Sequence, residues 1–132
     1  MSANSQPLFD CAMIGRAIVG KTLARNIARR GYHVAVDAPT AVSPQDVTTP
    51  DSGIARAADL PALVAMLRRP RRVILAWEGD AEGDAVLADL KPLLEPGDII
   101  IDTGDSPFTD TERRAAALAG GGVRLLGVGI AG

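Results

Sequence analysis

Short apolar runs alternate with helix-forming segments along this chain. The runs contain many β-branched residues and are apolar on both faces, as in Val73–Ala76 and Ile99–Ile101. Strands of this kind are typical of a parallel sheet that helices cover on both sides. The alternation therefore predicts an α/β fold with a doubly wound parallel sheet in three layers. Because crossover connections are right-handed, the strand order 3-2-1-4-5-6 is expected.

Glycine, proline and capping residues indicate where the elements begin and end. Gly31 follows the first helix as a C-cap, and Pro96-Gly97 separates the third helix from the next strand. Thr109 and Glu112 form a capping box, which predicts that the last helix begins at Asp110. The expected strands are Cys11–Gly15, His33–Asp37, Gly53–Ala55, Arg72–Trp77, Asp98–Asp102 and Val123–Gly129, and the expected helices are Gly20–Arg30, Ala58–Arg68, Ala81–Leu94 and Asp110–Ala119.

The length of 132 residues fits one domain over residues 1–132. Residues 38–52 hold three prolines and several Ser and Thr residues where a doubly wound fold normally has its second helix. An irregular loop is expected there, and residues 1–9 are expected to form a flexible N-terminus.

The charge of the chain argues against two classes of partner. Lys and Arg number 14 against 16 Asp and Glu, so no net positive field attracts nucleic acid or an anionic membrane. No apolar run approaches the ~18 residues that span a membrane. A local basic cluster surrounds Pro70 and is expected to form a solvated corner between a helix and a strand; it consists of Arg68, Arg69, Arg71 and Arg72.

Cys11 is the only cysteine, which excludes an intramolecular disulfide and fits a reducing compartment. Its apolar surroundings predict a small buried core residue rather than a nucleophile. The first ten residues lack the basic start and apolar stretch of a secretion signal. A cytoplasmic location is therefore expected.

A glycine-rich turn lies between the first expected strand and the first expected helix. Its sequence, GRAIVG over residues 15–20, stands where a Rossmann dinucleotide-binding fingerprint requires it. The first glycine permits a tight turn, the middle small residue leaves room for a pyrophosphate, and the last glycine allows close packing of helix on strand. A purely architectural turn is the alternative. The candidate binding residues of this turn are Gly15, Arg16, Ala17, Ile18, Val19 and Gly20.

Two long segments resemble 6-phosphogluconate dehydrogenases. The segment FDCAMIGRAIVGKTLARNIARRGYHVAV is similar to the opening of that family, including alanine in the middle of the fingerprint. The segment LKPLLEPGDIIIDTGDSPFTDTERRAAALAGGGVRLLGVGIAG is similar to a later part of the family's cofactor domain. Together they cover most of the chain from Phe9 to Gly132. The resemblance implies a Rossmann-type domain that binds NAD or NADP.

The chain departs from the family where the resemblance places the adenosine ribose. The family's Asn-Arg-Thr, which resembles a clamp for the 2′-phosphate of NADP, is replaced by residues 38–40, Ala-Pro-Thr, so that only Thr40 remains as a candidate contact. Asp37 precedes them, about 20 residues beyond the glycine turn, where an acidic residue binds the ribose hydroxyls of NAD. The alternative for Asp37 is a solvated strand end.

Further departures lie at the ends of the fourth and fifth expected strands. The family's Val-Lys-Ala-Gly becomes a segment that begins Trp77-Glu78, in which Trp77 either stacks on a ligand ring or caps the core. Asp105 replaces the family's asparagine beside the nicotinamide and accepts hydrogen bonds only. Trp77, Glu78 and Asp105 are kept as candidate cofactor contacts.

The sequence ends at Gly132, within the family's substrate loop. The catalytic lysine and glutamate of the family, and its large helical domain, lie beyond this point. The resemblance therefore implies that this chain alone does not perform oxidative decarboxylation. No catalytic residue and no metal ligand is assigned.

Three functions remain open at this level. One is a module that binds NAD, NADP or another phosphate-bearing small molecule. The second is a repurposed enzyme without a nicotinamide cofactor, such as a cyclase or other tailoring enzyme of a biosynthetic pathway, with its ligand in the same crevice. The third is a non-catalytic partner subunit. A homodimer or other self-association is expected through apolar residues at Ala115, Leu118 and Val123–Ile130.

Overall fold

The chain folds around one parallel sheet. A computed structural model describes residues 8–15, 18–37, 53–76, 80–103 and 108–128, on which all structural statements below rest. The six strands have the order β3-β2-β1-β4-β5-β6, as predicted, and all neighbours are parallel. The strands are β1 (Cys11–Ile14), β2 (Val34–Val36), β3 (Ile54–Arg56), β4 (Arg72–Leu75), β5 (Ile99–Asp102) and β6 (Arg124–Gly127).

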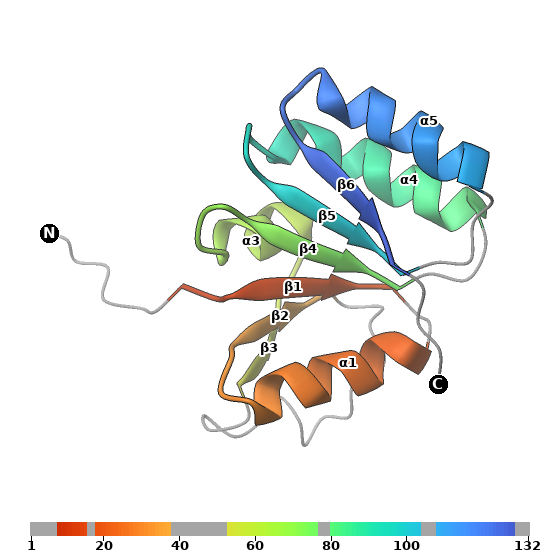
Figure 1. Cartoon of the computed structure of the whole chain (residues 1–132). Helices are drawn as coiled ribbons and strands as arrows, with labels where there is room; N and C mark the ends of the chain where they lie inside the picture. Colours follow the sequence, from red (N-terminus) through yellow and green to blue (C-terminus); the bar gives the residue numbers. More distant parts are fainter. Residues whose placement is uncertain (1–7, 16–17, 38–52, 77–79, 104–107, 129–132) are drawn as a thin grey trace, which may run out of the picture.

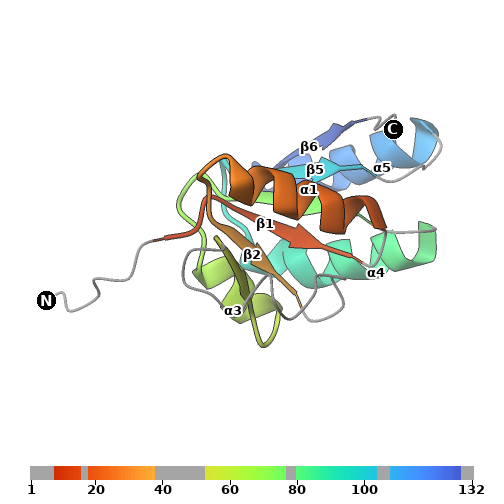
Figure 2. The ribbon, with the colours of Figure 1, turned by 90° about the horizontal axis from the view of Figure 1, so that it is seen from below.

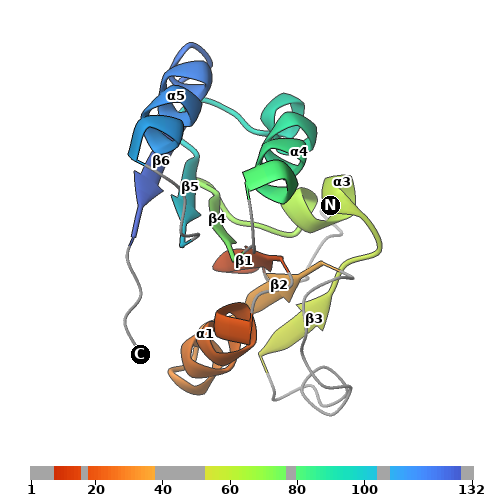
Figure 3. The ribbon, with the colours of Figure 1, turned by 90° about the vertical axis from the view of Figure 1, so that its right-hand side faces the viewer.

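Helices lie on both faces of the sheet (Figure 1), which confirms the three-layer Rossmann-like class. The helix α1 (Ile18–Arg29) lies on one face, and Figure 2 shows the molecule from this side. The other described helices lie on the opposite face (Figure 3); they are α3 (Leu60–Ala65), α4 (Asp80–Leu90) with a short 3-10 turn at Lys91–Leu93, and α5 (Phe108–Ala119).

The core is divided between the two faces of the sheet. The larger cluster packs the strands against α3, α4 and α5 and includes Leu63, Leu90 and Ile100. The smaller cluster packs β1, β2 and β3 against α1 and includes Met13 and Val36. No helix of the described part of the chain is long and apolar enough to cross a membrane.

Several predicted helix ends differ from the structure. α3 begins at Leu60 instead of Ala58, because the Asp59 side chain caps it by accepting a 2.8 Å hydrogen bond from the Ala62 amide. α4 ends at Leu90 because Pro92 lacks the amide that would continue the helix. α5 begins at Phe108, so the start at Asp110 that was predicted from the capping box is wrong by two residues. The sequence Ser-Pro just before Phe108 is also typical of a helix start.

The expected flexible N-terminus is wrong at Phe9. The Phe9 amide donates to the Met66 carbonyl at 2.7 Å, its carbonyl accepts from the Arg68 amide at 2.9 Å, and its ring packs edge-on against His33. Residues 1–7 and the expected loop at 38–52 lie outside the described residues.

Two predictions about individual side chains are tested by burial. Cys11 is buried, as predicted. The surface expected to drive self-association is wrong at Leu118 and Val123, because both side chains are buried in the larger core cluster. Leu126 and Val128, by contrast, are exposed.

The basic corner is largely as predicted. Arg68, Arg69 and Arg72 are exposed between α3 and β4. Arg71 is the exception, because its side chain is mostly buried and pairs with Asp98 at 3.4 Å. The corner therefore consists of three exposed arginines beside the mostly buried ion pair of Arg71 with Asp98.

Candidate functional site

The carboxyl ends of β1 and β4 meet at Gly15. Gly15 has a φ of +126°, and a Cβ built there would lie 2.1 Å from the Ala76 carbonyl oxygen. The Ala76 amide in turn donates to the Ile14 carbonyl at 2.7 Å. Only glycine fits this backbone conformation and this approach to β4, so the tight turn predicted from the sequence is present.

Gly20 brings α1 close to the sheet. A Cβ at Gly20 would lie 3.0 Å from the Ala76 Cβ and 3.6 Å from the Met13 side chain. The sequence predicts this close packing of helix on strand for the last glycine of the turn. It holds the first turn of a 12-residue helix beside the ends of β1 and β4. The first amides of a helix have no partners within the helix, and its dipole favours an anion there.

Asp37 lies next to this turn. It follows β2, is only 8% exposed, and its Oδ1 accepts from the Gly15 amide at 3.5 Å. The Asp37 carbonyl accepts from the Arg56 guanidinium at 2.7 Å, which fixes the backbone at the end of β2. Its burial excludes the alternative of a solvated strand end. Gly15, Asp37 and the start of α1 therefore form one corner of the sheet.

A buried ion pair lies at the end of β5, which the sequence reasoning missed. Asp102 is 2% exposed, and its Oδ2 lies 3.7 Å from Nη1 of Arg114 on α5. The neighbouring Thr103 donates its hydroxyl to the Leu75 carbonyl at 2.8 Å, which ties the ends of β4 and β5 together. The available signal was an aspartate that ends an otherwise apolar strand.

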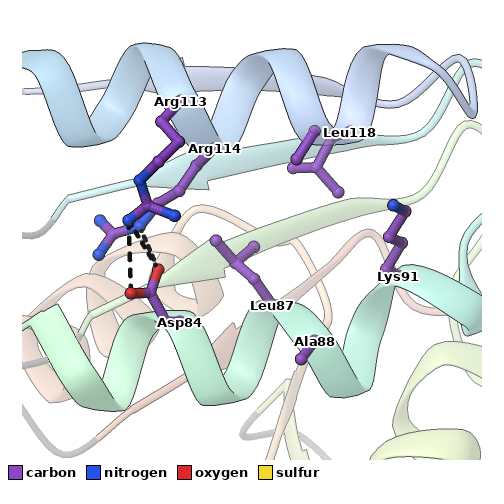
Figure 4. Close-up of a pocket in the computed structure, with 8 residues that line it drawn as sticks. Asp84, Leu87, Ala88, Lys91, Arg113, Arg114 and Leu118 are labelled. Carbon is purple, nitrogen blue, oxygen red and sulfur yellow. Dashed lines mark hydrogen bonds and ion pairs between the residues drawn. The ribbon is translucent and has the colours of Figure 1, made fainter.

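Arg114 also connects the two helices α4 and α5 (Figure 4). Its Nε donates to Oδ1 of Asp84 at 2.8 Å, and the more exposed Arg113 approaches the same carboxylate at 3.4 Å. The hydrogen bond from Arg114 lowers the pKa of Asp84 below its ordinary value, and the charges of both arginines act in the same direction.

A hollow of about 320 Å³ opens between these helices, with Leu87 and Leu118 among its lining residues (Figure 4). It lies on the face of the sheet opposite α1. It is therefore distinct from the corner formed by Gly15, Asp37 and α1.

The structure describes only part of the predicted site. Gly15, Gly20 and Asp37 come together as described above. Ile18 and Val19 lie in the first turn of α1, and their side chains are outside the described part. In the described ranges, no three His, Cys, Asp or Glu side chains are placed to hold a metal ion. The other candidates also lie outside the described residues: Arg16, Ala17, Thr40, Trp77, Glu78 and Asp105.

Comparison with known proteins shows the family of this chain. The sequence profile of the NAD binding domain of 6-phosphogluconate dehydrogenase matches residues 10–132. The chain belongs to this family. It is 42% identical over 128 residues to a decarboxylating 6-phosphogluconate dehydrogenase of Synechococcus elongatus, and 38% identical over 122 residues to one of Lactococcus lactis. These matches cover 95% and 91% of the chain but 27% and 26% of the relatives, so the chain spans about a quarter of their length.

Solved structures agree with this assignment to the NAD-binding domain family of 6-phosphogluconate dehydrogenase. The Plasmodium falciparum 6-phosphogluconate dehydrogenase, studied with its cofactor NADP+, matches 90% of the chain with a TM-score of 0.72 and 25% identity. A Mycobacterium tuberculosis 3-hydroxyisobutyrate dehydrogenase matches 95% of the chain with a TM-score of 0.76 at 20% identity, which shows the shared fold. The resemblance seen in the sequence is therefore confirmed, and the chain is an NAD(P)-binding type of domain.

Proposed function

We propose that this chain binds a nicotinamide dinucleotide at the corner formed by Gly15, Asp37 and the start of α1, and that it prefers NAD to NADP. The pyrophosphate would lie against the amino end of α1, where backbone amides and the helix dipole favour an anion. Gly15 and Gly20 hold that helix end at the edge of the sheet. When bound, the dinucleotide supplies hydride-transfer chemistry, and the protein supplies its position.

The observation that carries the preference for NAD is the buried carboxylate of Asp37 beside Gly15. A carboxylate at the end of the second strand accepts hydrogen bonds from the ribose hydroxyls of NAD. The same negative charge repels the 2′-phosphate of NADP. The sequence adds a second argument, since residues 38–40 contain no arginine to pair with that phosphate.

Calorimetric titration of the 132-residue protein with NAD and with NADP tests this proposal. We expect NAD to bind roughly tenfold more tightly than NADP, a difference of about 1.4 kcal/mol. Asp37→Asn keeps the side-chain size and removes the charge, so the ratio of the two affinities should fall towards one. Because both cofactors are measured on the same variant, a change in its stability does not imitate this result.

The matched control is Asp89→Asn, which removes an exposed carboxylate on α4 and should leave the ratio unchanged. Absence of binding of either cofactor at millimolar concentration would contradict the proposed function. Equal affinities in the unmodified protein, or a ratio that Asp37→Asn leaves unaltered, would contradict the role of Asp37.

We propose binding, rather than the complete reaction of the relatives, because the chain matches only about a quarter of their length. Oxidative decarboxylation by this chain alone is not part of the proposal. A cytoplasmic location, the homodimer, and the cyclase and partner-subunit alternatives stay predictions.

A further inference from the structure

One half of the sheet has no helix of the described residues on the α1 side. Along β5, Ile100 packs into the larger core and Asp102 meets Arg114 of α5, so Ile99 and Ile101 face the opposite side. In Figure 3, α1 lies below β1 and β2, whereas α4 and α5 lie above β4, β5 and β6. Ile74 of β4 packs at the border against the α1-side core cluster, and no described helix covers β5 and β6 on this face.

Apolar side chains line up across this uncovered half. Ile74 pairs in register with Ile101, and Ile101 pairs with Leu126, which places the three side chains in one row. Ile74 and Ile101 are half-buried, and Leu126 is 50% exposed. The row runs from the half-buried edge of α1 to the exposed Leu126, so it gives a partner an apolar strip to cover.

Two arginines border the apolar row. Arg72 pairs in register with Ile99, and Ile99 pairs with Arg124. Within the described ranges, neither Arg72 nor Arg124 lies within ion-pair distance of a carboxylate; Arg72 donates only to the Pro70 carbonyl, at 3.4 Å. Arg68 and Arg69 differ, because Asp10 and Glu95 pair with them at 3.0 and 2.8 Å. Among the described residues, the uncovered half thus carries two arginines without a carboxylate partner beside an apolar row.

A hollow of about 440 Å³ continues the row towards α1. Ile74 and Ile101 belong to both, and Ile27 and Tyr32, a residue that is 54% exposed, lie on its α1 side. Arg72 also lines it, as do Arg69 and the ion pair of Arg68 with Asp10. An occupant could therefore bury apolar side chains in the hollow while its polar groups meet Arg72.

We propose that this surface, formed by Arg72, Ile74, Ile99, Ile101, Arg124 and Leu126 and named here the β4–β6 face, binds an amphipathic α-helix of a partner protein whose apolar stripe is bordered by carboxylates. The distance from β4 to β6 is about 10 Å, because neighbouring strands lie about 4.8 Å apart. A helix with its side chains is about 10–12 Å wide. One helix therefore covers the face.

The charge of the β4–β6 face decides between a partner and a second copy. A second copy would bring the same two arginines and no carboxylate from its own β4–β6 face. A partner with Glu or Asp beside its apolar stripe would neutralise both. The proposal concerns a different surface from the cofactor corner and does not depend on cofactor binding.

Two labelled synthetic helical peptides test the proposal by fluorescence anisotropy. Both have leucine at i, i+3, i+4 and i+7, and one has glutamate and the other lysine beside this stripe. We expect the glutamate peptide to bind the intact chain at least roughly tenfold more tightly than the lysine peptide. The double variant Arg72→Glu/Arg124→Glu should reverse this preference, which a nonspecific apolar contact would not do.

Leu126→Glu should abolish binding of the glutamate peptide, while Lys91→Glu on the opposite face should change nothing. The thermal midpoint of each variant shows that it is folded. Equal binding of the two peptides, no binding at millimolar peptide, or a preference that the double variant retains would overturn the proposal. A concentration-dependent dimer that Leu126→Glu dissociates would overturn it in favour of a second copy.

Discussion

Gly15 shows how one residue determines both the path of the chain and the place of the candidate site. Its positive φ and its approach to the Ala76 carbonyl allow β1 to turn directly into α1. The same turn places the Gly15 amide against Asp37. A side chain at this position would therefore disturb the fold and the site together.

We predict that Gly15→Ala lowers the free energy of unfolding by roughly 3 kcal/mol or more, because it combines an unfavourable φ with a clash against backbone. Gly120→Ala is the matched control, since a Cβ there meets nothing within 4 Å and no positive φ is present. Urea unfolding of both variants measures the difference. A cost for Gly15→Ala no greater than that for Gly120→Ala would show that the turn tolerates a side chain.

Cys11 gives a prediction about pH. Burial raises its pKa from 9.0 to about 11, with the charge of Asp10 acting in the same direction and that of Arg72 against it. The folded-state pKa is above the unfolded one, so this contribution to stability is complete below pH 9 and is lost as the pH rises to about 11. The contribution is on the order of 2–3 kcal/mol.

The measurement compares the intact protein with Cys11→Ala by urea unfolding between pH 9 and pH 11. We expect the difference between the two proteins to shrink across this range, because only the intact protein has the thiol to ionise. A difference that stays constant over the range would mean that the thiol ionises as readily in the folded as in the unfolded chain.

At the scale of elements, α5 is attached to the sheet by a charge as well as by apolar packing. Arg114 reaches Asp102 at the end of β5 and Asp84 on α4. Leu118, one turn further along α5, lies in the larger core. The polar contact therefore fixes the middle of α5, while the apolar contact fixes its C-terminal end.

We predict that Arg114→Met lowers the free energy of unfolding by roughly 3–5 kcal/mol, because it leaves the buried Asp102 carboxylate without its partner's charge. The control Arg113→Met should cost less than about 1 kcal/mol, since Arg113 is largely exposed. Arg114→Met should also raise the pKa of Asp84 towards its ordinary value, which an NMR titration detects. Equal costs for the two arginines would contradict a structural role of the buried pair.

At the scale of the whole molecule, the two faces of the sheet are covered unequally. Three described helices cover one face, and α1 covers the β1–β3 half of the other. The cofactor corner lies at the carboxyl ends of β1 and β2, and the β4–β6 face lies on the other half of the sheet. The molecule can present both to ligands without rearranging its core.

We predict that NAD stabilises the whole fold, because binding to the folded state alone shifts the unfolding equilibrium. At a concentration a hundredfold above its dissociation constant, the gain is about 2.7 kcal/mol. Chemical denaturation with and without NAD measures it, and adenosine at the same concentration serves as control. An unchanged denaturation midpoint at saturating NAD would show that the folded chain does not bind NAD.

The sequence by itself determined the order of elements, the parallel sheet and the need for glycine at positions 15 and 20. These features depend on local periodicity, on the handedness of crossovers and on the conformations that single residues allow, all of which are present in the chain before it folds. The errors lie at the ends of helices and strands, at Phe9 and Arg71, and at the buried Leu118 and Val123, where contacts between distant segments compete with local signals.

Only the tertiary structure decided which side chains meet. Asp37 is buried against Gly15, Arg114 finds Asp102, and Leu126 aligns with Ile101 because parallel strands pair in one particular register. That register follows from packing both faces of the sheet together, so no local pattern states it in advance. The same packing leaves the β4–β6 face open on one side, a property that belongs to the assembled layers and to no single segment.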